Sequence, residues 1–211
     1  MISMRQKNLD LSVYFIADPT LCGGRDIVDV TMMAIKGGAT MVQYRNKLDP
    51  LNDVLAEAAM LQEWLSDTGV PLLINDYVDV AFAVGASGVH LGQGDSSPVE
   101  ARAKLGEDAI IGQTAFTAEH LAAVDPAVID YVGTGPFYPT KTDKGKPVLG
   151  AEKFAELVKL SPVPVVGIGG ITPENAKAVI DAGANGVAMM RSVSEAASPE
   201  EAARAFAELY G

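Results

Sequence analysis

Several residue types that would signal other protein classes are scarce in this sequence. Cys22 is the single cysteine among 211 residues, so an internal disulfide and a cysteine-rich metal site are excluded. No apolar run reaches the roughly 18–20 residues that a membrane helix requires, and Met1–Leu11 has no apolar stretch of the signal-peptide kind. We therefore expect a cytoplasmic protein without a membrane partner.

Positive charge is also in short supply. The chain has 16 Lys and Arg residues against 27 Asp and Glu, a formal net charge of −11, which argues against nucleic acid as a partner because such binding depends on cations that neutralise phosphates. A local group of basic side chains can still hold a small anionic substrate. Hydrophobic residues make up 48%, which excludes a disordered chain. Without a composition break or linker, we expect one domain over residues 1–211, and the sequence leaves a homo-oligomer open.

The sequence does contain a repeated alternation of short apolar runs and helical patterns. The runs are mostly continuously apolar, as expected for parallel strands covered on both faces; they are 13–18, 40–45, 71–75, 88–93, 109–114, 129–133, 163–168 and 186–190. Helix starts are indicated by a capping residue before proline, at Asp49-Pro50, Ser97-Pro98, Thr172-Pro173 and Ser198-Pro199. Eight such units predict a (β/α)₈ TIM barrel. The alternative, an open doubly wound sheet that binds a dinucleotide, lacks its glycine motif after the first strand.

In such a barrel, polar residues at the carboxyl ends of the strands are functional candidates. The second strand ends Gln43-Tyr44-Arg45-Asn46-Lys47, where alternation would put Gln43, Arg45 and Lys47 on one face if the strand persists. Two cations and an amide at the barrel mouth suit an oligophosphate. An exposed basic strand end is the equally weighted alternative.

Oxygen donors follow the next two strands. Asn75 and Asp76 end the third, and Asp95 follows the fourth, a pattern that suits Mg²⁺ with substrate phosphates as further ligands. Helix capping by Asp76 and Asp95 is the alternative. We favour the metal because Asp76 directly follows a buried strand.

Three further segments are suited to phosphate. The sixth strand runs into a glycine-rich stretch, 133–146, whose Thr140, Lys141, Thr142 and Lys144 supply donors, as in a cover loop. Gly169-Gly170 and Arg191-Ser192-Val193 follow strands seven and eight, where such barrels usually bind phosphate. Ordinary surface loops and glycines for tight packing are the alternatives.

The remaining reactive residue types do not predict a catalytic pair. His90 lies within a predicted strand and is interpreted as a core residue or one behind the site, and His120 as a surface residue on a helix. Cys22 is interpreted as an incidental small residue, and no Ser-His-Asp arrangement is present.

These segments together resemble the thiamine phosphate synthase family, nearly end to end. The match includes 43–47, 74–76, 88–95, 133–140 and 167–171 in the family's order. The family joins a pyrimidinylmethyl diphosphate to a thiazole phosphate, with loss of pyrophosphate. The resemblance implies Mg²⁺ on Asp76 and Asp95, the pyrimidine diphosphate on Gln43, Arg45, Lys47 and Asn75, and the thiazole phosphate on Thr140, Thr142, Gly170 and residues 191–193.

The chemistry of that reaction agrees with the residues present. A carbocation-like transition state requires stabilisation of departing negative charge and no protein nucleophile. Arg45, Lys47, Thr114 and Lys144 are therefore the catalytic candidates, and Tyr44, Asn46 and Lys141 are added to the substrate-binding set. Three positions depart from the family: Thr114 and Arg191 stand where many relatives have serine, and Asp143 precedes the lysine, here Lys144, that many relatives carry one position earlier.

Two other functions remain as alternatives. Thiazole tautomerase shares the barrel, but its relatives carry a histidine where this chain has Phe116. A barrel that binds both phosphorylated ligands without catalysis is the second alternative.

Overall fold

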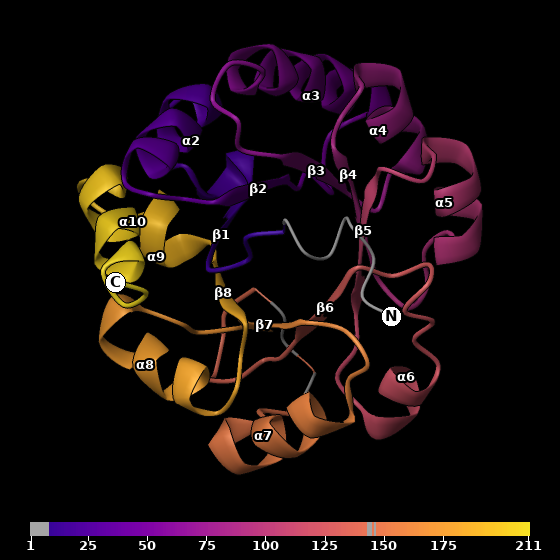
Figure 1. Cartoon of the computed structure of the whole chain (residues 1–211). Coiled ribbons are helices and arrows are strands. Elements are labelled where there is room, and N and C mark those ends of the chain that lie inside the picture. Colours follow the sequence, from indigo (N-terminus) through magenta and orange to yellow (C-terminus); the bar gives the residue numbers. More distant parts are fainter. Residues whose placement is uncertain (1–8, 143–144, 146) are drawn as a thin grey trace.

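The computed structural model describes residues 9–142, 145 and 147–211. Its parallel strands pair in chain order, and β1 also pairs with β8, which closes the barrel. Helices form a ring around the strands (Figure 1). The predicted (β/α)₈ TIM barrel is confirmed.

All eight apolar runs form strands within the described part of the chain. The strands are β1 Val13–Ala17, β2 Met41–Tyr44, β3 Leu72–Asn75, β4 Gly88–Leu91, β5 Ile110–Thr114, β6 Tyr131–Thr134, β7 Val165–Ile168 and β8 Gly186–Met189. Most strand residues are buried, because helices cover the outer face and side chains fill the interior.

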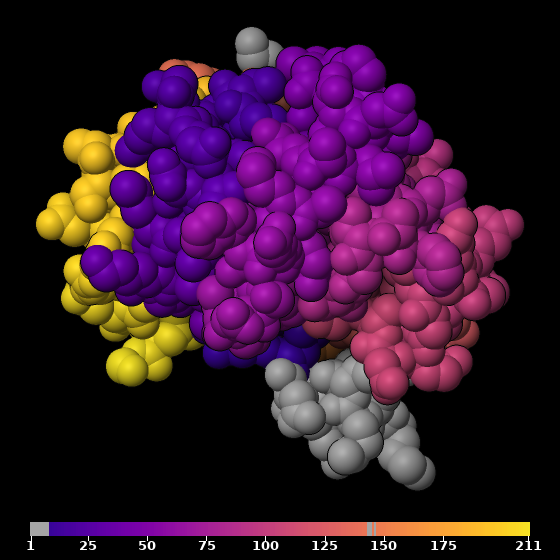
Figure 2. Space-filling model, turned by 90° about the horizontal axis from the view of Figure 1, so that it is seen from above, coloured from indigo at the N-terminus to yellow at the C-terminus, as the bar shows by residue number. Residues whose placement is uncertain are grey.

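The helices follow the strands around the barrel. They are η1 Pro19–Leu21, α2 Ile27–Lys36, α3 Leu51–Leu65, α4 Val78–Val84, α5 Pro98–Leu105, α6 Ala118–Ala122, α7 Gly150–Leu160, α8 Pro173–Asp181, α9 Arg191–Ser194 and α10 Pro199–Ala207. Figure 2, turned by 90° from the view of Figure 1, shows the face formed by the side chains of the N-terminal half, with the yellow C-terminal segment at the left edge beside the indigo segment. Within the described ranges, none of these helices is both long enough and apolar enough to cross a membrane.

Most of the predicted helix starts are confirmed. Ser97 accepts from the Glu100 amide at 3.3 Å, Ser198 accepts from the Glu201 amide at 3.2 Å, and Thr172 forms a capping box with Asn175. The prediction at Asp49-Pro50 was wrong: Pro50 itself precedes α3, and no side chain caps that helix.

Candidate functional site

A cavity of about 790 Å³ opens at the carboxyl ends of the strands. Its walls include the last residues of β3, β5, β7 and β8 and the turns that follow them. The volume lies within the range of small-molecule sites, and the position is the usual place for chemistry in this fold.

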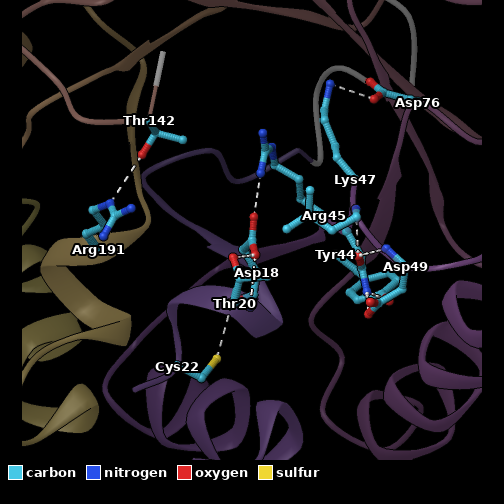
Figure 3. Close-up of polar contacts among 12 residues, drawn as sticks. Asp18, Thr20, Cys22, Tyr44, Arg45, Lys47, Asp49, Asp76, Thr142 and Arg191 are labelled. Carbon is cyan, nitrogen blue, oxygen red and sulfur yellow. Dashed lines mark hydrogen bonds and ion pairs between the residues drawn. The ribbon is translucent and has the colours of Figure 1, made fainter. Parts of the chain in front are cut away.

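Two cations reach this cavity from the segment after β2. Arg45 pairs with the carboxylate of Asp18, which is 3% exposed and also accepts from the Thr20 hydroxyl at 2.6 Å. Lys47 Nζ lies 2.8 Å from Asp76 Oδ2, and Figure 3 shows both cations with their partners. Since β2 ends at Tyr44, strand alternation does not continue to Arg45 and Lys47. These ion pairs hold the cations at the mouth instead.

Tyr44 and Asn46, also expected to bind substrate, do not line the cavity. The Tyr44 hydroxyl donates to Glu57 on α3 at 2.6 Å, because alternation along β2 directs Tyr44 away from the side of Gln43. Asn46 Oδ1 accepts from the Asp49 amide at 3.2 Å, and its Nδ2 donates to the Asp49 carboxylate at 2.8 Å. The structure thus gives Asn46 the role of stabilising the turn before α3.

Two carboxylates, Asp76 and Asp95, line the cavity on the side of Lys47, which pairs with Asp76. Burial raises the pKa of Asp76; the Lys47 ammonium lowers it and the neighbouring Asp95 carboxylate raises it again, with a net increase. Asp95 accepts from the Gly92 amide at 2.7 Å. Neither carboxylate is a helix cap, since Tyr77 precedes α4 and Ser97 precedes α5, so the capping alternative is wrong.

The donor set at this point fits a divalent cation. Two mutually repelling carboxylates supply hard oxygen ligands, and the left-handed backbone of Asp76, with φ of 64°, fixes the turn that carries one of them. Among the residues that the structure describes, no three or more His, Cys, Asp or Glu are grouped to hold a metal ion. A cation here would therefore need further ligands from a bound phosphate or water.

Two buried polar atoms on the cavity wall have no hydrogen-bond partner among the described residues. They are Asn75 Nδ2, at the end of β3, and Ser192 Oγ, on α9 after β8. A buried polar group without a partner is costly, so these two atoms are candidates to contact a ligand in the cavity. Strands β3 and β8 are three positions apart around the barrel, so the two atoms serve separate parts of the cavity.

The cavity wall also includes the turn after β7 and the start of α9. Gly170 lines the cavity with φ of 66°, and a Cβ there would lie 2.5 Å from the Pro139 oxygen, so its geometry supports the alternative of a glycine required for tight packing. Arg191 lines the cavity too and donates from Nε to the Thr142 hydroxyl at 3.4 Å (Figure 3). It also pairs with Glu195.

The remaining predicted residues of the segments after β6 and β8 differ in where the structure places them. Thr140 and Lys141 line the cavity, as predicted. Val193 does not: its side chain is fully buried in the main hydrophobic core, which strand and helix residues share, because the turn of α9 directs it away from the mouth. Lys144 lies outside the described residues.

The cavity floor contains polar side chains that we did not predict as site residues. Tyr14, His90 and Tyr131 line it together with the predicted Gln43 and Thr114. His90 does lie within a strand, but it faces the cavity. The sequence did offer a signal for the two tyrosines: each is a single phenol within an apolar strand, and a buried hydroxyl requires a hydrogen-bond partner.

Comparison with known proteins agrees with this geometry. Residues 13–193 match the family model described as thiamine monophosphate synthase. The thiamine-phosphate synthase of Azorhizobium caulinodans is 45% identical over 197 residues, which cover 92% of each chain, and that of Laribacter hongkongensis is 44% identical over 97% of this chain and 96% of the relative.

A solved structure has the same fold. The thiamine phosphate pyrophosphorylase from Pyrococcus furiosus superposes with a TM-score of 0.85 at 30% identity, covering 98% of this chain and 97% of that one. The match in sequence and the match in structure both extend over nearly the whole chain. The chain therefore belongs to the thiamine monophosphate synthase family.

Proposed function

We propose that this chain joins an aminopyrimidinylmethyl diphosphate to a thiazole phosphate, giving thiamine phosphate and pyrophosphate. The observation that carries the proposal is the pair of unsatisfied buried donors, Asn75 Nδ2 and Ser192 Oγ, on separate parts of one cavity. Two phosphorylated substrates would satisfy one donor each. Family membership supplies the reaction.

The diphosphate belongs on the β2–β4 side of the cavity. Arg45 and Lys47 offer the positive charge, and Asn75 offers an amide donor. Both cations are already held by carboxylates, Asp18 and Asp76, so little reorganisation is needed when the diphosphate arrives. This side therefore suits the more highly charged substrate.

The thiazole phosphate belongs beside Gly170 and Ser192. The Ser192 hydroxyl and Thr140 supply donors there, and Gly170 keeps the turn after β7 packed closely against Pro139 at the cavity wall. The Arg191 guanidinium is placed to add a charge-assisted contact once it leaves Glu195.

The cavity residues promote the reaction by stabilising the negative charge of the leaving group and by orienting the two substrates. As the bond from the pyrimidine methylene carbon to the diphosphate oxygen breaks, Arg45 and Lys47 stabilise the charge that develops on the departing oxygens. The donors near Gly170 hold the thiazole so that its ring nitrogen faces the same carbon and forms the new bond. Thr114 and Lys144 remain catalytic candidates from the sequence.

Magnesium fits this scheme as the cation held by Asp76 and Asp95. Mg²⁺ is commonly bound by one or two carboxylates and completed by substrate phosphates, which agrees with the donor set found here. When bound, it would neutralise negative charge on the diphosphate as that group leaves.

One assay tests both the reaction and the metal. Purified protein is mixed with the two substrates and Mg²⁺, and pyrophosphate and thiamine phosphate are measured. We expect both products in equal amounts, and loss of turnover when a chelator removes the metal. A thiazole tautomerase or a non-catalytic binding barrel would form neither product.

The metal ligands are tested in limiting Mg²⁺. Asp76→Ala and Asp95→Ala should each reduce kcat/KM by about a hundredfold or more, as expected when charge stabilisation in the transition state is lost. The matched control is Asp79→Ala, because Asp79 lies on α4, is exposed and pairs only with Lys104 among its described contacts. If both cavity variants match the control, the metal assignment is wrong.

A further inference from the structure

A chain of four hydrogen bonds crosses the barrel interior at the cavity floor. Gln43 Nε2 lies 2.6 Å from the Tyr14 hydroxyl, which lies 2.7 Å from the Tyr131 hydroxyl. His90 Nδ1 lies 2.9 Å from the Tyr131 hydroxyl, and His90 Nε2 lies 3.0 Å from the Thr114 hydroxyl. The five side chains come from five strands, in the order β2, β1, β6, β4 and β5, so the hydrogen bonds connect strands across the barrel interior.

Two glycines make room for this chain. A Cβ on Gly112 would lie 2.1 Å from Tyr131 Cζ, and a Cβ on Gly133 would lie 3.2 Å from His90 Cε1. Any side chain at Gly112 would displace the Tyr131 ring, and one at Gly133 would press on His90. The interior of β5 and β6 is thus shaped to admit these two rings.

The direction of the hydrogen bond at the Gln43 end determines which atom donates in each of the other three hydrogen bonds. The Gln43 amide nitrogen donates to Tyr14, so the single Tyr14 proton is given to Tyr131. Tyr131 then donates to Nδ1 of a neutral His90 imidazole, whose proton is on Nε2 and is donated to Thr114. Burial raises the pKa of both phenols, so they stay protonated and act as donors.

We infer that this chain fixes which hydrogen-bonding group each end presents to a ligand in the cavity. With its nitrogen engaged, Gln43 offers the carbonyl oxygen as an acceptor. Thr114, which accepts from His90, has its own proton to donate. Tyr14, Tyr131 and His90 are positioning residues. They set which hydrogen-bonding group Gln43 and Thr114 present, and only those two would contact the ligand.

This polarity matches an aminopyrimidine, so the inference rests on the proposed function. The exocyclic amine of such a ring is a donor suited to Gln43, and a ring nitrogen is an acceptor suited to Thr114. A pyrimidine with a ring carbonyl in place of the amine reverses the pattern, setting oxygen against oxygen at Gln43. Accepting that analogue would require all four links to reverse together, since each hydroxyl carries one proton.

The test compares two substrates in two variants. Tyr131→Phe keeps the ring and removes the central hydroxyl, and with it two of the four hydrogen bonds. Tyr44→Phe removes a buried phenol of the same kind that contacts Glu57 outside the cavity. For each protein we would measure kcat/KM with the amino- and the oxo-pyrimidine diphosphate. Binding of the oxo analogue to any protein too slow to turn over is measured by inhibition.

Wild type and Tyr44→Phe should prefer the amine strongly. Tyr131→Phe should reduce that preference at least tenfold, because Gln43 and Thr114 can then reorient, while KM for the thiazole phosphate stays unchanged. A loss of activity that is equal for both pyrimidines would show a purely structural role and overturn the inference. If Tyr131→Phe does not fold, as judged by circular dichroism, Tyr14→Phe removes the neighbouring hydroxyl with its two hydrogen bonds, and we expect the same result. Absence of product in wild type would instead contradict the proposed function.

Discussion

At the scale of single residues, strand alternation and two ion pairs place the side chains on the β2 side of the cavity. Gln43 faces the interior because it lies within β2, and by the same alternation Tyr44 faces the helices. Arg45 and Lys47 follow the strand, and their placement depends on Asp18 and Asp76, which are distant in sequence. Such ion pairs cannot be read from local spacing, which is why Asp18 was missed.

Asp18 and Arg45 lead to a prediction about the division of the cavity. Arg45→Ala removes one charge-assisted contact, which should cost about 1.5–3 kcal/mol, and so raise KM for the pyrimidine diphosphate by about tenfold to a hundredfold. KM for the thiazole phosphate should change little. Separate titrations of the two substrates measure this difference.

The conservative variant Asp18→Asn serves as the companion to Arg45→Ala. It keeps the guanidinium but loses the carboxylate that orients it, so the same KM should rise by a smaller factor. Equal losses for both substrates in Arg45→Ala would contradict the proposed division.

At the scale of elements, the strands and most helix starts were predictable because each depends on local sequence. Ser97 and Ser198 cap their helices as expected. Asp49 fails to cap α3 because Asn46 occupies its carboxylate in the preceding turn. The direction of side chains within α9 was not predictable: neighbouring residues of so short a helix point to different sides, so Ser192 faces the cavity and Val193 the core.

Arg191 connects two parts of the fold that are distant in sequence. It joins α9 to the segment after β6 through Thr142, and its pair with Glu195 is partly exposed. Although it pairs with Glu195, its side chain also lines the cavity, where the sequence predicts phosphate binding.

We expect Arg191→Ser to raise KM for the thiazole phosphate about tenfold, which corresponds to roughly 1.4 kcal/mol. KM for the dephosphorylated thiazole alcohol should stay nearly constant, since only the phosphate needs the guanidinium. Stability should change little, because exposed ion pairs contribute little. If phosphate and alcohol lose affinity equally, or neither does, Arg191 is not a phosphate ligand.

At the scale of the whole molecule, the two ends of the barrel serve different purposes. The mouth holds unsatisfied donors and paired charges, whereas the opposite end is tied together by a buried ion pair, Arg102 with Asp130, whose nitrogen and oxygen atoms lie 2.7 Å apart. Arg102, 7% exposed, also donates to the backbone oxygen of Val128 at 2.8 Å, and Asp130 accepts from the Ile111 amide at 2.8 Å. These contacts join α5 to the starts of β5 and β6.

Breaking this pair should destabilise the barrel and leave the cavity intact. Arg102→Met removes the charge and keeps much of the side-chain volume, so Asp130 is left buried without its cation, at a cost of about 3–5 kcal/mol in the free energy of unfolding. The control is Lys104→Met, two residues further along α5, whose exposed pair with Asp79 should contribute under about 1 kcal/mol. Urea unfolding measures both, and steady-state kinetics should give unchanged KM values for both substrates in each variant, because neither residue lines the cavity. Equal stability of the two variants would show that the buried pair does not hold the closed end of the barrel together.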